Sequence, residues 1–306
     1  MAKAKADEKI LSYNDVVLRR SDIDILSGPY FLNDRIIEFY FSYLTSCYPS
    51  EDILLIPPSI AFWIKECPDI SSLKDFVEPL HLQRRKLIIF PINDNADVSM
   101  AEGGSHWSLL AFERNANVFV HHDSSGGINN AHAKRVYRAV ISYTASDAKY
   151  VECSSSPRQD NGYDCGLYVT AIARVICEWY QNDRPRGTDD LWFAAIKEQI
   201  TPSHVSKMRN DILELSTALV GFLACFIPPL AYAYEDTIQR PEAWRKNSKH
   251  LPYLFSGDKK VRPSIPHRFL KEEIAGESPS RQLAAGALKR RLGVALFPWP
   301  GAPHQF

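Results

Sequence analysis

The chain has 306 residues, and its 45% hydrophobic and 24% charged content is typical of a globular protein with one good core. Residues 1–225 carry 23 Lys and Arg against 29 Asp and Glu, whereas residues 226–306 carry 13 against 7. An acidic main body argues against nucleic acid as the principal partner and allows a basic protein partner.

The first elements are helical after a short extended start. Residues 1–9 are polar, and we expect them to be disordered. Extended segments are predicted at residues 12–18 and 21–26. Three helices follow, because a cap, a proline or a serine precedes apolar residues at helical spacing; they begin near Asn33, Pro58 and Ser72.

The pattern then changes to that of a sheet. Residues 86–92 are a continuous apolar run, which indicates a strand buried on both faces. Residues 106–112 and 118–123 predict two more strands, joined by a hairpin turn. A helix, a short strand and two closing helices follow at residues 133–143, 150–153, 189–200 and 205–219. We therefore predict an α+β fold with a small central sheet flanked by helices.

A change in composition near residues 222–228 predicts a domain boundary, because the last 81 residues hold 10 of the 20 prolines. We expect a folded domain over residues 10–225 and a flexible, basic, proline-rich extension over 226–306. Residues 215–234 contain no charged residue, and their length alone suits a membrane span. Two consecutive prolines interrupt that run, so we favour a core-packed helix leading into a linker and expect no membrane association.

Residues 159–166, Gln-Asp-Asn-Gly-Tyr-Asp-Cys-Gly, form a polar loop that runs into apolar residues at helical spacing. Asp164 fits an N-cap, which places Cys165 at the first helical position, where the helix dipole favours a thiolate. The alternative is a buried structural cysteine, since free Cys is among the most buried residue types. A position directly after a cap, rather than inside a helix, favours the nucleophile.

A cysteine nucleophile needs a base, a group that orients the base, and donors for the oxyanion. His106 opens a predicted strand and Asp123 ends its hairpin partner, so we expect both side chains at the same sheet edge. Gln159 lies in the loop that must pass the nucleophile, where its amide and the backbone N–H of Cys165 can form an oxyanion hole. A lone His is otherwise a structural residue, but the four positions together predict a catalytic site.

Other classes of site fit less well. The order His, Asp, Cys excludes a papain-type enzyme, and the helix after Cys165 argues against a chymotrypsin-like cysteine protease. Six scattered cysteines and nine histidines show no zinc spacing, so we expect no metal and no cofactor. The first residues lack the apolar stretch of a secretory signal, and we expect a reducing compartment, the cytoplasm or nucleus.

Three motifs resemble those of the sentrin/SUMO-specific and adenain-like cysteine proteases. They are Gly-Gly-Ser-His106-Trp107-Ser-Leu-Leu, the Asp123-Ser124 strand end, and Gln159-x-Asn161-x-x-Asp164-Cys165-Gly166. The sequence is most similar to the deneddylase branch, which cleaves the Nedd/Rub ubiquitin-like modifier. There the resemblance extends over about residues 10–222 and also covers Leu11-Ser12-Tyr13, Phe31-Leu32-Asn33-Asp34, Ile92-Asn93-Asp94-Asn95 and Ile200-Thr201-Pro202.

The resemblance implies an adenain-like fold and four catalytic roles. The roles of general base, orienting group, nucleophile and oxyanion-hole donor fall to His106, Asp123, Cys165 and Gln159, respectively. It also implies that Trp107 roofs a narrow tunnel for the modifier's Gly-Gly tail, with Phe31 where the family has Trp. Asn33 and Asp34 follow in the same tunnel motif, and Asp34 is our candidate for binding an arginine that precedes the Gly-Gly.

The sequence therefore predicts a thiol isopeptidase that removes and matures a Nedd/Rub-type modifier. Its partners would be that modifier and its conjugates, such as cullins by resemblance, and we expect a monomer. One alternative is a deSUMOylating protease of the same family, and another is an acyltransferase that uses the same triad. A non-catalytic binder of ubiquitin-like proteins is disfavoured because the full triad and Gln159 are present.

Overall fold

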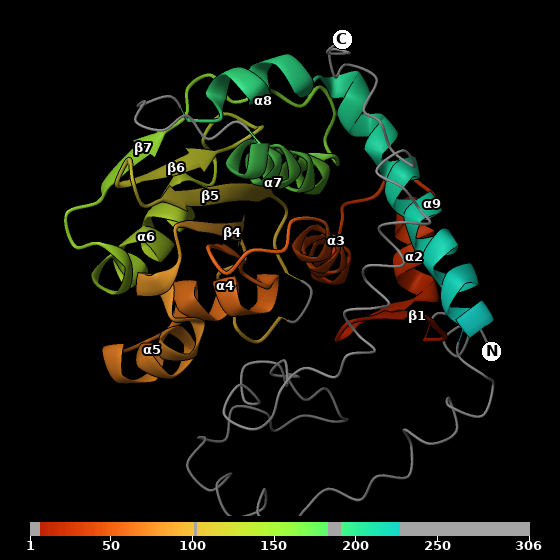
Figure 1. Ribbon diagram of the computed structural model, residues 1–306, viewed down its shortest axis with the longest axis horizontal. Helices are drawn as coiled ribbons and strands as arrows, with labels where there is room; N and C mark the ends of the chain where they lie inside the picture. Colours follow the sequence, from red (N-terminus) through yellow and green to blue (C-terminus); the bar gives the residue numbers. More distant parts are fainter. Residues whose placement is uncertain (1–6, 101–102, 183–190, 227–306) are drawn as a thin grey trace, which may run out of the picture.

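The apolar run predicted as a buried strand is an inner strand of a five-stranded sheet (Figure 1) in the computed structural model, which describes residues 7–100, 103–182 and 191–226. The strands are β3 (Ile53–Leu55), β4 (Leu87–Asn93), β5 (Trp107–Glu113), β6 (Val118–His122) and β7 (Lys149–Glu152), paired in that order. The pairs β4–β5 and β5–β6 are antiparallel, and the outer pairs are parallel. The three-residue strand β3 was missed because it is too short to show a periodicity.

The sheet separates two hydrophobic clusters, and successive residues of β4 contribute to them in turn. Leu87 and Ile89 pack with helices α3 (Asp34–Cys47) and α7 (Cys165–Asn182). Ile88 and Phe90 pack with α4 (Pro58–Glu66) and α6 (Asn130–Thr144) on the other face. Figure 1 shows α7 and α6 on opposite sides of the sheet. Both faces are covered, which explains why the sequence of β4 shows no alternation of apolar and polar residues.

The predicted helices after residue 33 are confirmed. The side chain of Asn33 accepts a hydrogen bond of 3.1 Å from the backbone N–H of Ile36, so it caps α3 as predicted. Helix α4 begins at Pro58, and α5 (Ile70–Val77) follows it. Two 3₁₀ turns, η1 (Glu78–Leu80) and η2 (Leu82–Arg84), then lead to β4.

The prediction of an extended segment at residues 21–26 was wrong. Strands β1 (Lys9–Tyr13) and β2 (Val16–Arg19) form an antiparallel pair, and helix α2 (Arg20–Leu26) follows directly. The Asp22 carboxylate accepts a hydrogen bond of 2.7 Å from the backbone N–H of Arg19 and is fully buried against the Arg35 guanidinium, 3.0 Å away. This capping and charge pairing outweigh the local alternation of apolar and polar residues that suggested a strand.

Helices α8 (Phe193–Gln199) and α9 (Pro202–Phe226) close the described chain, and α9 packs against α2 and α7 (Figure 1). Both correspond to predicted helices, although α8 begins four residues later than its predicted start at residue 189. Among the described residues, no helix combines the length and the apolar character needed to cross a membrane. Residues 1–6 and 227–306 lie outside the described residues, so the predicted tail and domain boundary stay predictions.

Candidate active site

Cys165 is the first residue of α7, as the loop-to-helix pattern predicted, and its side chain is buried. The following Gly166 allows this position, because a Cβ there would lie 2.8 Å from the Cβ of Leu32. Any side chain at 166 would push α7 away from the segment that precedes α3. The small residue after the cysteine therefore brings the start of α7 close to Leu32.

The predicted N-cap role of Asp164 was wrong in its chemistry. Its carboxylate accepts hydrogen bonds from Asn161 Nδ2, Ser206 Oγ and Arg209 Nη2, each at 2.9 Å, rather than from the first-turn amides of α7. A buried carboxylate is stabilised far more by a guanidinium than by amides, and no pattern in the sequence indicates that residue 209 lies nearby. Within the described residues, the N–H of Cys165 consequently has no side-chain acceptor.

His106 and Asp123 lie at the same edge of the β5–β6 hairpin. His106 Nε2 is 2.7 Å from Asp123 Oδ1, and both residues are buried. Burial alone would lower the pKa of His106, but hydrogen bonds to Asp123 and Cys165 and the charges of both raise it to about 9. Because Asp123 occupies Nε2, the nitrogen left to serve Cys165 is Nδ1. These contacts are compatible with the predicted arrangement of nucleophile, base and orienting acid.

Asp123 is held ionised by its surroundings. Burial would raise the pKa of its carboxyl, but hydrogen bonds from His106 and from the backbone N–H groups of Asn129 and Ser125 lower it to about 2. Those two backbone bonds measure 2.9 Å and 2.8 Å. An ionised, fixed carboxylate favours the protonated imidazole beside it.

Two further residues that the sequence did not identify as functional hold His106 in place. The Asp94 carboxylate accepts hydrogen bonds from the backbone N–H groups of Ser105 and His106, at 2.6 Å and 3.0 Å. Asn129, fully buried, donates through Nδ2 to the carbonyl of His106 at 3.2 Å, while its own N–H binds Asp123. Asn129 therefore connects the backbone of His106 with the carboxylate of Asp123. The motif around Asp94 was the one sequence feature that pointed to the contact between Asp94 and the backbone of His106.

Gln159 lies beside these residues, and both ends of its side-chain amide are engaged. Its Oε1 accepts a hydrogen bond of 2.6 Å from Ser124 Oγ, and its Nε2 donates one of 2.7 Å to the carbonyl of Asn161. The backbone N–H of Gln159 also binds the carbonyl of Ser124 at 3.0 Å. Ser124 therefore fixes which way the amide points, and one hydrogen of Nε2 is left for another acceptor.

The four predicted substrate-binding residues lie around Leu32. Trp107 is nearly buried, and its Nε1–H donates a hydrogen bond of 3.0 Å to the carbonyl of Leu32. Phe31 is 49% exposed, so an aromatic ring stands at the surface beside that anchored indole. Asn33 caps α3 and also donates to Asp22, which gives it a structural contact. Asp34 is partly exposed and accepts a 2.9 Å hydrogen bond from the N–H of Arg35.

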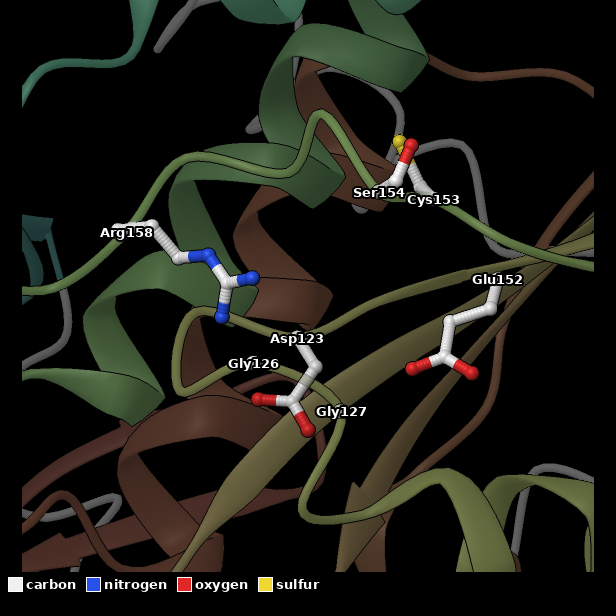
Figure 2. Close-up of a pocket in the computed structure, with 7 residues that line it drawn as sticks. All are labelled: Asp123, Gly126, Gly127, Glu152, Cys153, Ser154 and Arg158. Carbon is white, nitrogen blue, oxygen red and sulfur yellow. The ribbon is translucent and has the colours of Figure 1, made fainter.

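An open pocket of about 680 Å³ adjoins His106 and Gln159. Its lining includes Ser124, Ser125, Ile128, Arg158 and Asp160, and it is largely polar. A smaller pocket of about 340 Å³ lies behind Asp123 and the adjacent glycine turn, and Figure 2 shows its lining residues. Arg158 belongs to both linings, so the two pockets adjoin one another.

Comparison with known proteins agrees with this geometry. Residues 30–215 match the family described as the Ulp1 protease family, C-terminal catalytic domain. The chain is 53% identical over 222 residues to NEDD8-specific protease 1 of Arabidopsis thaliana, an alignment that covers 72% of this chain and 98% of that protein. It is 34% identical over 221 residues to Sentrin-specific protease 8 of Homo sapiens, covering 70% and 98% of the two chains.

Solved structures share the fold. The yeast Ulp1 protease domain in complex with Smt3, the yeast ortholog of SUMO, has a TM-score of 0.51 at 20% identity and covers 71% of this chain and 92% of its own. A structure described as the de-sumoylating protease has a TM-score of 0.52 at 18% identity, covering 74% and 96%. The predicted α+β protease fold is thereby confirmed.

Proposed function

The chain belongs to the Ulp1 protease family and is a cysteine-type protease, and from this premise we propose that it cleaves after the C-terminal Gly-Gly of a Nedd/Rub-type modifier. The observation that carries the choice of modifier is the 53% identity to a NEDD8-specific protease over 98% of that protein. The same reaction on a precursor matures the modifier, and on a conjugate it releases the modified lysine. Other members of the family bind other ubiquitin-like modifiers, such as Smt3.

In the proposed mechanism, the Cys165 thiolate attacks the carbonyl carbon of the modifier's last glycine. A C–S bond forms, and the developing oxyanion is bound by the backbone N–H of Cys165 and by Gln159 Nε2. The C–N bond then breaks, and His106 Nδ1 gives its proton to the leaving amine while Asp123 holds the ring through Nε2. Water, deprotonated by the same histidine, hydrolyses the thioester and releases the glycine carboxylate.

The acyl side of the substrate would run along Phe31 and Trp107. A tail ending in Gly-Gly fits between two aromatic walls because glycine has no side chain, whereas any Cβ would meet a ring. The hydrogen bond from Trp107 to Leu32 fixes one wall against the segment that carries the other. Phe31 in place of the family's Trp gives a slightly wider channel, so Phe31→Trp should preserve activity or tighten substrate use.

Asp34 is our candidate for the residue that selects the tail. Its carboxylate lies three residues after Phe31 at a partly exposed position, where it can pair with an arginine that precedes the Gly-Gly. Asp34→Ala should weaken cleavage and flatten its salt dependence, since a charge-assisted contact is lost. We further propose a monomeric enzyme of the cytoplasm or nucleus that acts on conjugated proteins such as cullins.

A panel of electrophilic probes built on different ubiquitin-like C-termini tests the proposed function. We expect a covalent adduct with the Nedd/Rub-type probe, a far weaker one with SUMO, and none with Cys165→Ala, which retains its fold and its non-covalent binding. Equal kcat/KM values for SUMO and Nedd/Rub substrates would contradict the specificity and leave the thiol protease standing. Acyl transfer from acetyl-coenzyme A to a protein lysine, without probe reaction, would favour the acyltransferase.

A further inference from the structure

On the leaving-group side of the scissile bond, the substrate must extend away from the modifier's tail. The aromatic wall of Phe31 and Trp107 lies outside the lining of the 680 Å³ pocket, although His106 and Gln159 are part of that lining. A polypeptide extends in opposite directions from the scissile carbonyl. If the modifier's tail follows the aromatic wall, as the proposed function requires, this polar pocket faces the leaving group.

Arg158 lines this pocket, and its backbone is held in place by hydrogen bonds. Its carbonyl accepts a 2.9 Å hydrogen bond from Tyr168 Oη on α7, and the next N–H, that of Gln159, binds the carbonyl of Ser124. Figure 2 shows its side chain extending toward the turn that carries Asp123 and Gly126. A Cβ at Gly126 would displace the flexible end of the Arg158 side chain, and the φ of +89° at this residue favours glycine. The glycine therefore leaves the space that the guanidinium occupies.

The guanidinium of Arg158 makes no hydrogen bond or ion pair with any other described residue. It is also the single Lys or Arg side chain that lines either pocket in the described part of the chain. The acids nearby have partners of their own. Glu152 accepts a hydrogen bond from Asn130, Asp160 accepts one from Asn161, and Asp94 binds the backbone of His106. A cation on an exposed, backbone-fixed position can accept an anionic partner from outside.

We propose that Arg158 forms a leaving-group subsite that binds an Asp or Glu side chain of the polypeptide released by cleavage. In a precursor this acid lies in the extension after the Gly-Gly, and in a conjugate it lies near the modified lysine. The contact would be a charge-assisted hydrogen bond where the two pockets adjoin one another. It gives the enzyme a preference among conjugates that the modifier's own tail cannot supply, because that tail is the same in all of them.

Substrates that differ only after the scissile bond test this subsite. The Nedd/Rub-type modifier is fused through its Gly-Gly to hexapeptides that carry either two Asp or two Lys residues, and is also prepared as a fluorogenic aminocoumarin amide. For each enzyme variant, kcat/KM on both peptides is divided by the value on the amide. We expect Arg158→Ala to lower the acidic-to-basic ratio about threefold and Arg158→Glu about tenfold, as for partly exposed ion pairs.

The matched control is Lys149→Glu, which makes the same change in charge at an exposed position of β7 outside both linings. This variant should keep the wild-type ratio, and 0.5 M salt should reduce the ratio of the wild type toward that of Arg158→Ala. An acidic-to-basic ratio that is the same in wild type and Arg158→Glu would overturn the subsite. Failure of the wild type to hydrolyse even the aminocoumarin amide would instead overturn the proposed function on which this inference rests.

Discussion

The guanidinium of Arg209, on the last described helix, donates a hydrogen bond of 2.9 Å to the carboxylate of Asp164, the residue before Cys165. The same guanidinium donates to the carbonyls of Ile25 and Tyr30, at 3.1 Å and 2.8 Å. One cation therefore joins α9, the end of α2, the residue before Phe31 and the turn that carries the nucleophile.

Arg209→Ala should destabilise the protein by about 3–5 kcal/mol, because it leaves the buried Asp164 carboxylate without its cation. Urea denaturation measures the loss, and Arg209→Lys, which keeps the charge but not the fork of donors, should lose less. A change below about 1 kcal/mol for the alanine variant would show that Asp164 finds another partner.

Asp123→Asn should reduce kcat by about 10²–10⁴-fold and also change the pH dependence. The pKa of His106 is raised to about 9, so the imidazolium is present below that pH and the activity of the wild type should fall above it. The variant removes the negative charge and the acceptor on Nε2, so its alkaline limb should move to lower pH. A full pH profile of kcat/KM for both enzymes measures this shift. An alkaline limb at the same pH in both enzymes would mean that Cys165 alone raises the pKa of His106.

Gln159→Ala should lower kcat by roughly 10²-fold with little change in KM, since an oxyanion donor acts mainly in the transition state. Ser124→Ala should lower kcat by a smaller factor, because Ser124 orients the amide of Gln159 without contacting the oxyanion. In the double variant the serine change should have no further effect. Additive losses would mean that Ser124 acts independently, and a loss confined to KM would make Gln159 a substrate-binding residue.

His121 and His122 should make the folded state less stable at acid pH. Burial lowers their pKa values to about 4 and about 3, below the value of about 6.5 in an unfolded chain. The unfolded state therefore binds more protons, and stability falls as pH drops below about 6.5. Protonation of His122 would also break the hydrogen bond that its Nε2 accepts from Trp192.

The test compares His121→Asn with the wild type, because Glu38 acts in the opposite sense: burial raises its pKa to about 7, so its protonation stabilises the fold at lower pH. Between pH 7 and pH 5, the free energy of unfolding of His121→Asn should improve relative to wild type by about 2 kcal/mol. A constant difference across this range would contradict a neutral buried His121.

The sequence predicted the elements that carry local signals. The pattern of a polar loop followed by apolar residues at helical spacing predicted Cys165 at the start of α7. The hairpin pattern predicted His106 beside Asp123. The alternation of apolar and polar residues at 21–26 led to a wrong prediction of an extended segment, because the buried ion pair of Asp22 with Arg35 is not visible in a short window of sequence. The proposed roles of the site residues stay predictions until the variants above are measured.

Contacts between distant segments could not be predicted from one sequence. Asn129 reaches the carbonyl of His106 across 23 residues, and Arg209 reaches Asp164 across 45. Neither residue lies in a motif with a recognisable spacing, and each acts through geometry that exists once the sheet and α9 are packed. Asp164 was predicted as a helix cap for the same reason, since two of its three hydrogen-bond donors, Ser206 and Arg209, come from α9.

The position of Arg209 also sets an order of events during synthesis. A growing chain contains His106 and Cys165 before residue 209 is made, but the Asp164 carboxylate then lacks its counter-charge, and the carbonyls of Tyr30 and Ile25 lack their donor. The turn bearing Cys165 is therefore completed after α9, the last helix among the described residues, has been made. A chain that ends before residue 209 therefore lacks the cation that holds this turn, and we expect its Cys165 to react more slowly than in the finished domain.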